Sequence, residues 1–415
     1  MQRRAFLKTT AASALVPLLP LAGTAQTAPA AQSKADAFRS RIKPITKQEH
    51  DERIARAQQL MKEQNIDVMF FEGGTSLNYF TGSRWGRSER LFAMMLAQTG
   101  DPEFIAPRFE DMRAREQVGT YRLFLWRENE SPYVALMNFL KKHNCSTGVL
   151  GIEETVRYFV VEGIKKICPS VDLVSGTPVT AGCRSVKSDH EIELIQIGND
   201  ITKEVYQTAV TRLKEGMTER DFASVISQLY SEYGVNGGAL VLFGEASASA
   251  HGLEKPQTLK ENQIVLMDGG CTVEGYESDV TRTICFGTPT AEMQKVFDIV
   301  LKAQNAGLAA AKPEVPAERI DFAARKVIAD AGFGPGFRFF THRLGHGIGM
   351  DGHEWYYLVP GSKRAVVARN MFSNEPGIYQ LGKFGIRIED EMLITEDGAK
   401  ILLPRAQSLD TMFTA

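Results

Sequence analysis

The chain has 415 residues, of which 24% are charged, and its formal net charge is −2. This near balance gives no basis for nucleic acid or an anionic membrane surface as a partner. Once a leader of about 33 residues is set aside, the remaining length is enough for two domains with cores of their own.

The N-terminus has the pattern of an export signal. Arg3 and Arg4 precede an apolar stretch at residues 9–21, and small residues follow at 22–25, where a signal peptidase would cut. The stretch is short and contains two prolines, so we expect a cleaved twin-arginine signal, with an N-terminal membrane anchor as the alternative. Residues 1–33 are therefore predicted to be signal and linker. The mature chain is expected to be periplasmic or exported, without stable membrane insertion.

Residues 34–180 are predicted to form a small α/β domain. Thr46 and Glu49 have the spacing of a capping box, which marks the start of a helix. Helical stretches at 133–142 and 155–166 then alternate with strand-like runs. These runs lie at 66–71, 91–96 and 148–152.

Residues 181–415 are predicted to form a larger α+β domain. Ser188 and Glu191 make a second capping box, and another helix is expected to begin at Thr218. Further helices are predicted at 292–311 and 317–331. Strands are predicted at 240–243, 264–267, 280–286, 371–373 and 386–395. Helices grouped beside a long antiparallel sheet are typical of the α+β class.

The cysteines do not point to a metal site of their own. Residues 145, 168, 183, 271 and 285 show no Cys-x-x-Cys spacing, so a thiolate zinc site is not expected. An oxidising compartment permits a Cys145–Cys168 bridge, which the sequence alone does not establish. The favoured interpretation for all five is a small buried apolar side chain.

Five potential metal ligands occur in the C-terminal half, each in a short context of glycine or strand residues. They are Asp268, Asp279, His346, Glu375 and Glu389. Taken singly, each acid has an ordinary interpretation as a solvated surface group, and the histidine as a structural residue. Together, four carboxylates and one imidazole suit a pair of divalent ions such as Mn²⁺, Co²⁺, Zn²⁺ or Fe²⁺. So many like charges would be costly in one place without metal.

The predicted strands place these ligands near one another. Asp268 is expected to close one strand and Asp279 to open the next, as in a hairpin. Glu375 is expected at a strand end and Glu389 on the strand that follows. His346 is expected on an irregular segment between glycines, which allow close backbone approach.

These motifs resemble those of the pita-bread-fold metallopeptidases, family M24. This family holds methionine aminopeptidase, Xaa-Pro aminopeptidase and prolidase. The resemblance rests on Leu-Met-Asp268-Gly-Gly, Glu-Ser-Asp279-Val-Thr, Gly-His346-Gly-Ile-Gly, Asn-Glu375-Pro-Gly and Arg-Ile-Glu389-Asp. It implies a C-terminal pita-bread domain preceded by a smaller α/β creatinase-type domain, which methionine aminopeptidase lacks. It also implies two divalent ions, with manganese first and cobalt, zinc or iron as alternatives.

The resemblance further implies a role for each residue. Asp268 and Glu375 bind one or both metals, Asp279 chelates one, Glu389 bridges and His346 completes the set. His251 and His353 fall at substrate-side positions, and Arg387, beside the last ligand, is expected to be catalytic with them. Imidazoles there suit an oxyanion donor and an acid for the leaving amine, and Glu375 is the candidate proton relay. The alternatives are a buried structural role for His251 and a loop surface for His353. His342 is interpreted as structural or as a support for the ligands.

The leading hypothesis is an exopeptidase for small peptides, an Xaa-Pro aminopeptidase, with a prolidase-type dipeptidase as the alternative. Ala250, Trp355 and Asn370 depart from the family pattern around the pocket, which leaves proline specificity open. A lyase on the same scaffold would change the acid spacing near Asp268 and Asp279, and a binding module would lose the ligands.

A homodimer or higher oligomer is also expected. A basic cluster precedes the second predicted strand and consists of Arg84, Trp85, Arg87 and Arg90. It either reaches a neighbouring active site in such an oligomer or forms a solvated loop.

Overall fold

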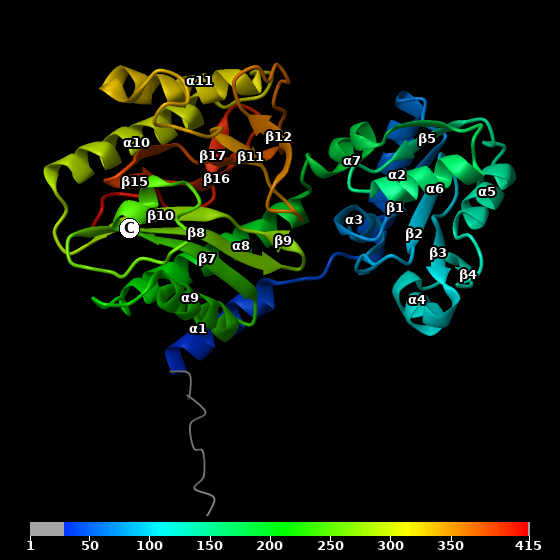
Figure 1. Ribbon diagram of the computed structural model, residues 1–415, viewed down its shortest axis with the longest axis horizontal. Helices are drawn as coiled ribbons and strands as arrows, with labels where there is room; N and C mark the ends of the chain where they lie inside the picture. Colours follow the sequence, from blue (N-terminus) through cyan, green and yellow to red (C-terminus); the bar gives the residue numbers. More distant parts are fainter. Residues whose placement is uncertain (1–28, 414–415) are drawn as a thin grey trace, which may run out of the picture.

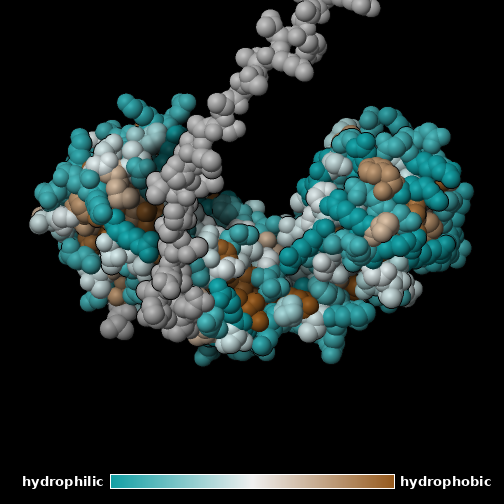
Figure 2. All heavy atoms as spheres, turned by 90° about the horizontal axis from the view of Figure 1, so that it is seen from below, coloured by the Kyte–Doolittle hydropathy of each residue, from teal (hydrophilic) through white to brown (hydrophobic). Residues whose placement is uncertain are grey.

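The structure is a computed structural model that describes residues 29–413, with side chains described from Lys34 onward. The predicted export signal at Arg3 and Arg4 lies outside the described residues. Within the described part of the chain, no helix is both long and apolar enough to cross a membrane. Figure 1 shows two domains side by side, and in Figure 2 they form two lobes with a hollow between them.

The smaller domain is built on a six-stranded mixed sheet with the order β4-β3-β2-β1-β5-β6. Its strands are β1 (Val68–Glu72), β2 (Ala93–Ala97), β3 (Glu103–Pro107), β4 (Arg122–Trp126), β5 (Val149–Ile152) and β6 (Asp172–Ser175). β1 pairs antiparallel with β2 and parallel with β5. The three strands β1 to β3 are buried at every residue, as expected for a sheet covered on both faces.

Helices cover both faces of this sheet. They are α2 (Lys47–Glu63), α3 (Thr75–Thr81), α4 (Asp111–Val118) and α7 (Thr177–Arg184) on one face, and α5 (Tyr133–Lys142) and α6 (Tyr158–Ile167) on the other. A 3₁₀ turn, η1 (Arg108–Glu110), precedes α4. Met69 and Phe71 point into the first cluster and Val68 and Phe70 into the second, because neighbouring strand residues face opposite sides.

The larger domain holds its strands between two pairs of helices. One pair is α8 (Asp189–Val210) with α9 (Glu219–Tyr233), and the other is α10 (Ala291–Ala310) with α11 (Ala317–Ile328), which runs on into η3 (Ala329–Phe333). Figure 1 shows the two pairs on opposite sides of the strands. Each pair closes its own hydrophobic cluster against the sheet nearest to it. The α+β prediction is confirmed.

The strands of this domain form two antiparallel sheets and a hairpin. The first sheet is β10-β8-β7, with β9 on β8, and the second is β12-β11-β13-β16-β17. Their bounds are β7 (Asn236–Phe243), β8 (Gln263–Val273), β9 (Tyr276–Glu277), β10 (Val280–Phe286), β11 (Gly345–Gly347), β12 (Glu354–Leu358), β13 (Met371–Asn374), β16 (Asp390–Ile394) and β17 (Ala399–Ile401). The hairpin pairs β14 (Gly377–Gln380) with β15 (Phe384–Arg387), and η2 (Gly244–Ala248) follows β7. The predicted strand at 386–395 is therefore wrong as one unit, because Ile388 and Glu389 separate two strands of different sheets.

The helix α1 (Pro29–Arg41) belongs with the larger domain, although the range 34–180 placed it in the smaller one. It lies beneath α8 and α9 in Figure 1. Arg41 donates to Asp200 at 2.8 Å, and Phe38 meets Tyr233 edge to face at 5.8 Å. All five cysteines are free thiols, four of them buried, so the Cys145–Cys168 bridge is not formed in the structure.

A buried group of charges ties the smaller domain to the larger one. Arg184, at the end of α7, pairs with Glu354 and donates to Asp351 at 2.7 Å. Lys187 Nζ lies 3.0 Å from the other Glu354 oxygen. Burial alone would raise the pKa of Glu354, but Lys187 and Arg184 lower it to about 2. Because Glu354 also accepts the Met350 N–H at 2.9 Å, the group shapes the loop that carries His353.

Arg184→Met should destabilise the chain strongly. The side chain of Arg184 is only 3% exposed, and its loss strips a buried carboxylate of one partner, which costs about 3 kcal/mol. Arg127→Met removes an exposed pair with Glu130 and should cost less than about 1 kcal/mol. Urea unfolding of both variants measures the difference. Equal losses of unfolding free energy would show that the buried group stabilises the chain no more than a surface ion pair does.

Candidate active site

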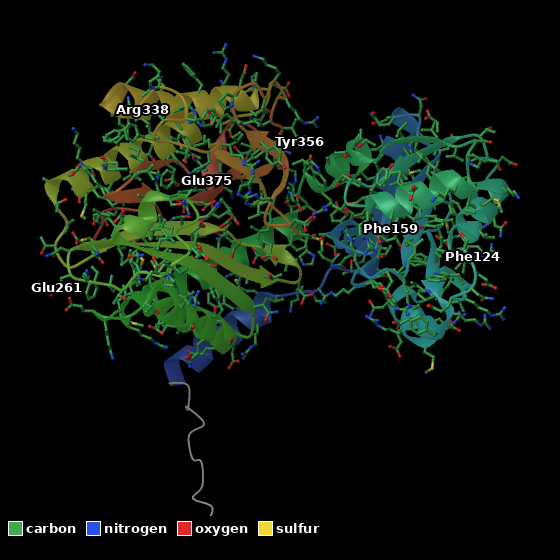
Figure 3. All side chains as sticks on the ribbon, in the orientation of Figure 1. Phe124, Phe159, Glu261, Arg338, Tyr356 and Glu375 are labelled. Carbon is green, nitrogen blue, oxygen red and sulfur yellow. The ribbon has the colours of Figure 1, made fainter. Side chains whose placement is uncertain are left out.

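The five predicted ligands come together from both sheets of the larger domain. They line one pocket of about 150 Å³ with His251, His342, Arg343, His353 and Arg387. Figure 3 shows Glu375 in the interior of this domain, among the strands. The expected convergence is therefore present in the geometry.

The local placement of three ligands differs from the expectation. Asp268 lies inside β8, opposite Thr281, because β8 continues to Val273 before it turns. Glu389 lies between β15 and β16 and not on a strand. His346 is the middle residue of β11, with a shift in the pairing to β12 just after it. Asp279, directly before β10, and Glu375, directly after β13, lie where expected.

The two glycines beside His346 are required by close backbone contacts. A Cβ on Gly345 would meet the Ser373 carbonyl oxygen at 1.9 Å, and one on Gly347 would meet the Trp355 carbonyl oxygen at 2.0 Å. The backbones of β13 and β12 can therefore approach β11 closely on its two sides. The His346 N–H donates to Ser373 Oγ at 3.0 Å, and that hydroxyl donates to Glu375 Oε1 at 3.0 Å. Ser373 therefore fixes the position of the His346 segment relative to the Glu375 carboxylate.

The His346 ring presents one free nitrogen to the acids. Its Nδ1 lies 3.0 Å from the Gly347 carbonyl oxygen and donates to it, which leaves the Nε2 lone pair free. Nε2 lies 3.4 Å from Glu375 Oε1 and 3.8 Å from Asp279 Oδ2. Three overlapping groups of ligand atoms lie close enough to share an ion. These are Asp268, Asp279 and Glu389; His346, Glu375 and Glu389; and Asp279, His346 and His353.

The acids are poorly stabilised as anions by protein groups alone. Burial, followed by the charges of neighbouring acids, raises the pKa of Asp279 and of Glu389 well above the usual range. Burial also raises the pKa of Glu375 to about 8. Burial lowers the pKa of His346 to about 4, so the imidazole is neutral. Such a set of oxygen donors and one neutral nitrogen fits divalent cations, which supply the missing positive charge.

Asp268 is the exception among the buried acids. Burial would raise its pKa, but the Arg387 guanidinium and hydrogen bonds bring it below its ordinary value. Arg387 also donates to the Tyr379 hydroxyl at 2.7 Å and to the Ala250 carbonyl oxygen at 3.3 Å. The arginine therefore connects a predicted ligand to the segment that carries His251. Arg387 lines the pocket beside Asp268, and its catalytic role stays a prediction.

His251 and His353 lie at the mouth of the pocket and are both exposed. The His353 ring stacks on the His346 ring, with centroids 3.7 Å apart and planes inclined by 23°. Neither a buried structural role for His251 nor a free loop position for His353 agrees with this placement. Burial lowers the pKa of His353 and the Arg343 charge lowers it further, so a neutral imidazole is favoured at neutral pH.

Two supporting residues escaped the sequence analysis. The Tyr379 hydroxyl lies 2.7 Å from His342 Nε2 and accepts from Arg387, so it links two pocket residues. Glu391 accepts the Asp279 N–H at 2.8 Å and thereby holds that ligand's backbone. Tyr379 stands in the Glu-Pro-Gly-Ile-Tyr motif, which was a usable signal, whereas the contact of Glu391 follows only from the crossing of β10 and β16.

The basic cluster at residues 84–90 lies outside this pocket. Trp85 is buried and stacks on Phe92 with ring centroids 4.1 Å apart, and the Arg113 guanidinium carbon lies 4.2 Å from the Trp85 ring centroid. Arg90 pairs with Glu128 at 3.0 Å, and Arg87 donates to the Gly73 carbonyl oxygen at 2.7 Å. Within the described chain these side chains support the smaller domain.

Two protein-family models match the chain, one in each domain of the structure. The model of the creatinase/prolidase N-terminal domain matches residues 53–186, and the model of metallopeptidase family M24 matches residues 193–396. An uncharacterized peptidase of Schizosaccharomyces pombe is 36% identical over 375 residues, which cover 85% of this chain and 81% of that protein.

Solved structures show the same fold over the full length of both domains. Dipeptidase PepE from Mycobacterium ulcerans superimposes with a TM-score of 0.82 at 28% identity, covering 89% of this chain and 99% of that one. A prolidase from Thermococcus sibiricus gives a TM-score of 0.78 at 31% identity, covering 85% and 96%. The chain therefore belongs to metallopeptidase family M24, with a creatinase-type N-terminal domain before its pita-bread peptidase domain.

Proposed function

We propose that the pocket holds two divalent metal ions and that the chain is an exopeptidase that cleaves small peptides before proline. The observation that carries this proposal is the convergence of four carboxylates and one imidazole on one small pocket, with two histidines at its mouth. Two structural neighbours, a dipeptidase and a prolidase, support a short peptide as substrate.

The donor set would hold the ions through Asp268, Asp279, His346, Glu375 and Glu389. Oxygen donors dominate, which favours manganese, with cobalt, zinc and iron as alternatives. Bound divalent ions supply Lewis acidity toward a peptide carbonyl and a water of lowered pKa.

The chain's own side chains supply the remaining chemistry. Glu375, held by Ser373, accepts the proton of the attacking water. His353 and His251 face the open side of the pocket, where one donates a hydrogen bond to the developing oxyanion and the other passes a proton to the leaving nitrogen. Arg387 keeps Asp268 ionised and in place.

A free N-terminus is expected to be part of the recognised substrate. A peptide's ammonium group can donate charged hydrogen bonds to a pocket carboxylate, and an acetylated terminus loses that charge and those donors.

The protein loaded with Mn²⁺ should release alanine from Ala-Pro and from Ala-Pro-Ala, and it should leave N-acetyl-Ala-Pro uncut. Liquid chromatography of the products measures this directly. Ala-Ala should be cut more slowly if the bond before proline is preferred. Cleavage inside longer peptides, or equal cleavage of the acetylated peptide, would rule out an exopeptidase.

A further inference from the structure

Two arginines line the pocket, and they differ in the hydrogen-bonding partners of their guanidinium groups. The guanidinium of Arg387 is occupied by Asp268, Tyr379 and the Ala250 carbonyl. The guanidinium carbon of Arg343 lies 4.2 Å from the ring centroid of Tyr357. Among the described residues, no acid or carbonyl accepts a hydrogen bond from the Arg343 side chain. Its donors therefore remain free for a ligand.

The position of Arg343 is fixed by the strands around the site. Arg343 comes two residues before β11, and Tyr357 of β12 pairs with His346 across the two strands. Tyr357 is 40% exposed, so its ring forms a surface on which the guanidinium rests. An aromatic face attracts a cation and limits the orientations of a long side chain. The free arginine is thus held beside the pocket that it lines.

We propose that Arg343, supported by Tyr357, binds the free C-terminal carboxylate of the substrate and so directs the enzyme toward dipeptides. This inference rests on the proposed exopeptidase function and decides between its dipeptidase and aminopeptidase forms. A guanidinium matches a carboxylate with two parallel N–H···O bonds, which a neutral amide cannot reproduce.

The chemistry of a dipeptide fits this placement. Its carboxylate is separated from the scissile carbonyl by a single residue, so both groups must lie in or beside one pocket. A carboxylate taken out of water beside the pocket is costly unless a cation pairs with it. Arg387 cannot bind the substrate carboxylate, because its guanidinium is already paired with Asp268. In a longer peptide the same position carries an uncharged amide, so Arg343 forms no ion pair there and does not increase the affinity for the longer peptide.

The test compares Ala-Pro, Ala-Pro-amide and Ala-Pro-Ala with the Mn²⁺-loaded wild type and the Arg343→Met variant. We expect the substitution to raise KM for Ala-Pro about 10- to 100-fold, the usual effect of losing a charged hydrogen-bonding partner. The assays are run at about pH 8, where His353 is neutral with or without the Arg343 charge. The kcat for Ala-Pro, and KM for the amide and the tripeptide, should then change by less than about threefold. Arg343→Lys should retain part of the affinity for Ala-Pro that Arg343→Met loses. Lysine keeps the positive charge but cannot make the two parallel hydrogen bonds of a guanidinium.

Arg364→Met is the matched control. Arg364 also rests on a tyrosine of β12, with its guanidinium carbon 3.7 Å from the Tyr356 centroid, but it does not line the pocket. Figure 3 shows Tyr356 at the edge of the domain, away from Glu375. This variant should leave all three KM values unchanged.

Two failures can be told apart. If the wild type cleaves all three peptides and Arg343→Met changes KM for Ala-Pro and its amide by the same factor, the role of Arg343 is overturned while the exopeptidase stands. If the wild type cleaves no Xaa-Pro peptide, the proposed function is overturned and this inference with it.

Discussion

Glu375→Gln should lower kcat by about 10²- to 10⁴-fold while the chain keeps part of its bound metal. Glutamine preserves the shape and one ligating oxygen, but it cannot accept a proton from water. The Glu375 carboxylate is well placed for that task, since Ser373 Oγ lies 3.0 Å from one oxygen and His342 Nδ1 lies 3.7 Å from the other. The variant should still bind product or a competitive inhibitor.

Asp279→Asn should fail for a different reason. Asp279 belongs to two of the three groups of candidate ligands, so loss of its charge weakens metal binding first. Excess Mn²⁺ or Co²⁺ should therefore restore part of its activity, whereas Glu375→Gln should stay slow at any metal concentration. Activity against added metal measures both variants. Full rescue of Glu375→Gln by metal would show that Glu375 is only a ligand and that another group takes the proton.

His353→Ala should lower turnover by about two to four orders of magnitude and leave the metal content near that of wild type. The exposed His353 ring faces the pocket mouth, and its contact with the site is a stack on His346. His251→Ala should behave in the same way. Steady-state kinetics and elemental analysis on the same preparations give the two quantities.

His143→Ala serves as the control for these variants. His143 lies at the end of α5 in the smaller domain, against Phe139, and far along the chain from the site. Its replacement should leave turnover unchanged. Because His353 lies within reach of Asp279 and His346, a loss of metal in His353→Ala would instead assign His353 to the ligands.

Much of the fold could be predicted because local signals and tertiary packing agree. The capping boxes at Thr46 and Ser188 are both formed, at the starts of α2 and α8. Helix α1 was misplaced, since its sequence shows where a helix forms but not which domain it packs against. The break at Glu389 was also missed, because Ile386 and Ile388 continue a β-like pattern while the chain passes from one sheet to another.

The site could be predicted only as a set of residue types in motifs. Glycines beside His346 marked close backbone approach, and the structure shows His346 and the four acids in one pocket. Their binding of metal stays a prediction. The contacts that distinguish the two arginines could not be predicted, because Arg343 meets Tyr357 only through the pairing of β11 with β12. Arg184 and Glu354, 170 positions apart, likewise meet only in the folded chain.

The most direct test of the account is the amount of metal that the purified chain retains as Mn²⁺ is added, measured by elemental analysis after gel filtration. We expect a plateau at two ions per chain, with peptide cleavage rising in parallel and lost on chelation. A chain that retains no stoichiometric metal, or that cleaves Ala-Pro equally well after chelation, would contradict it.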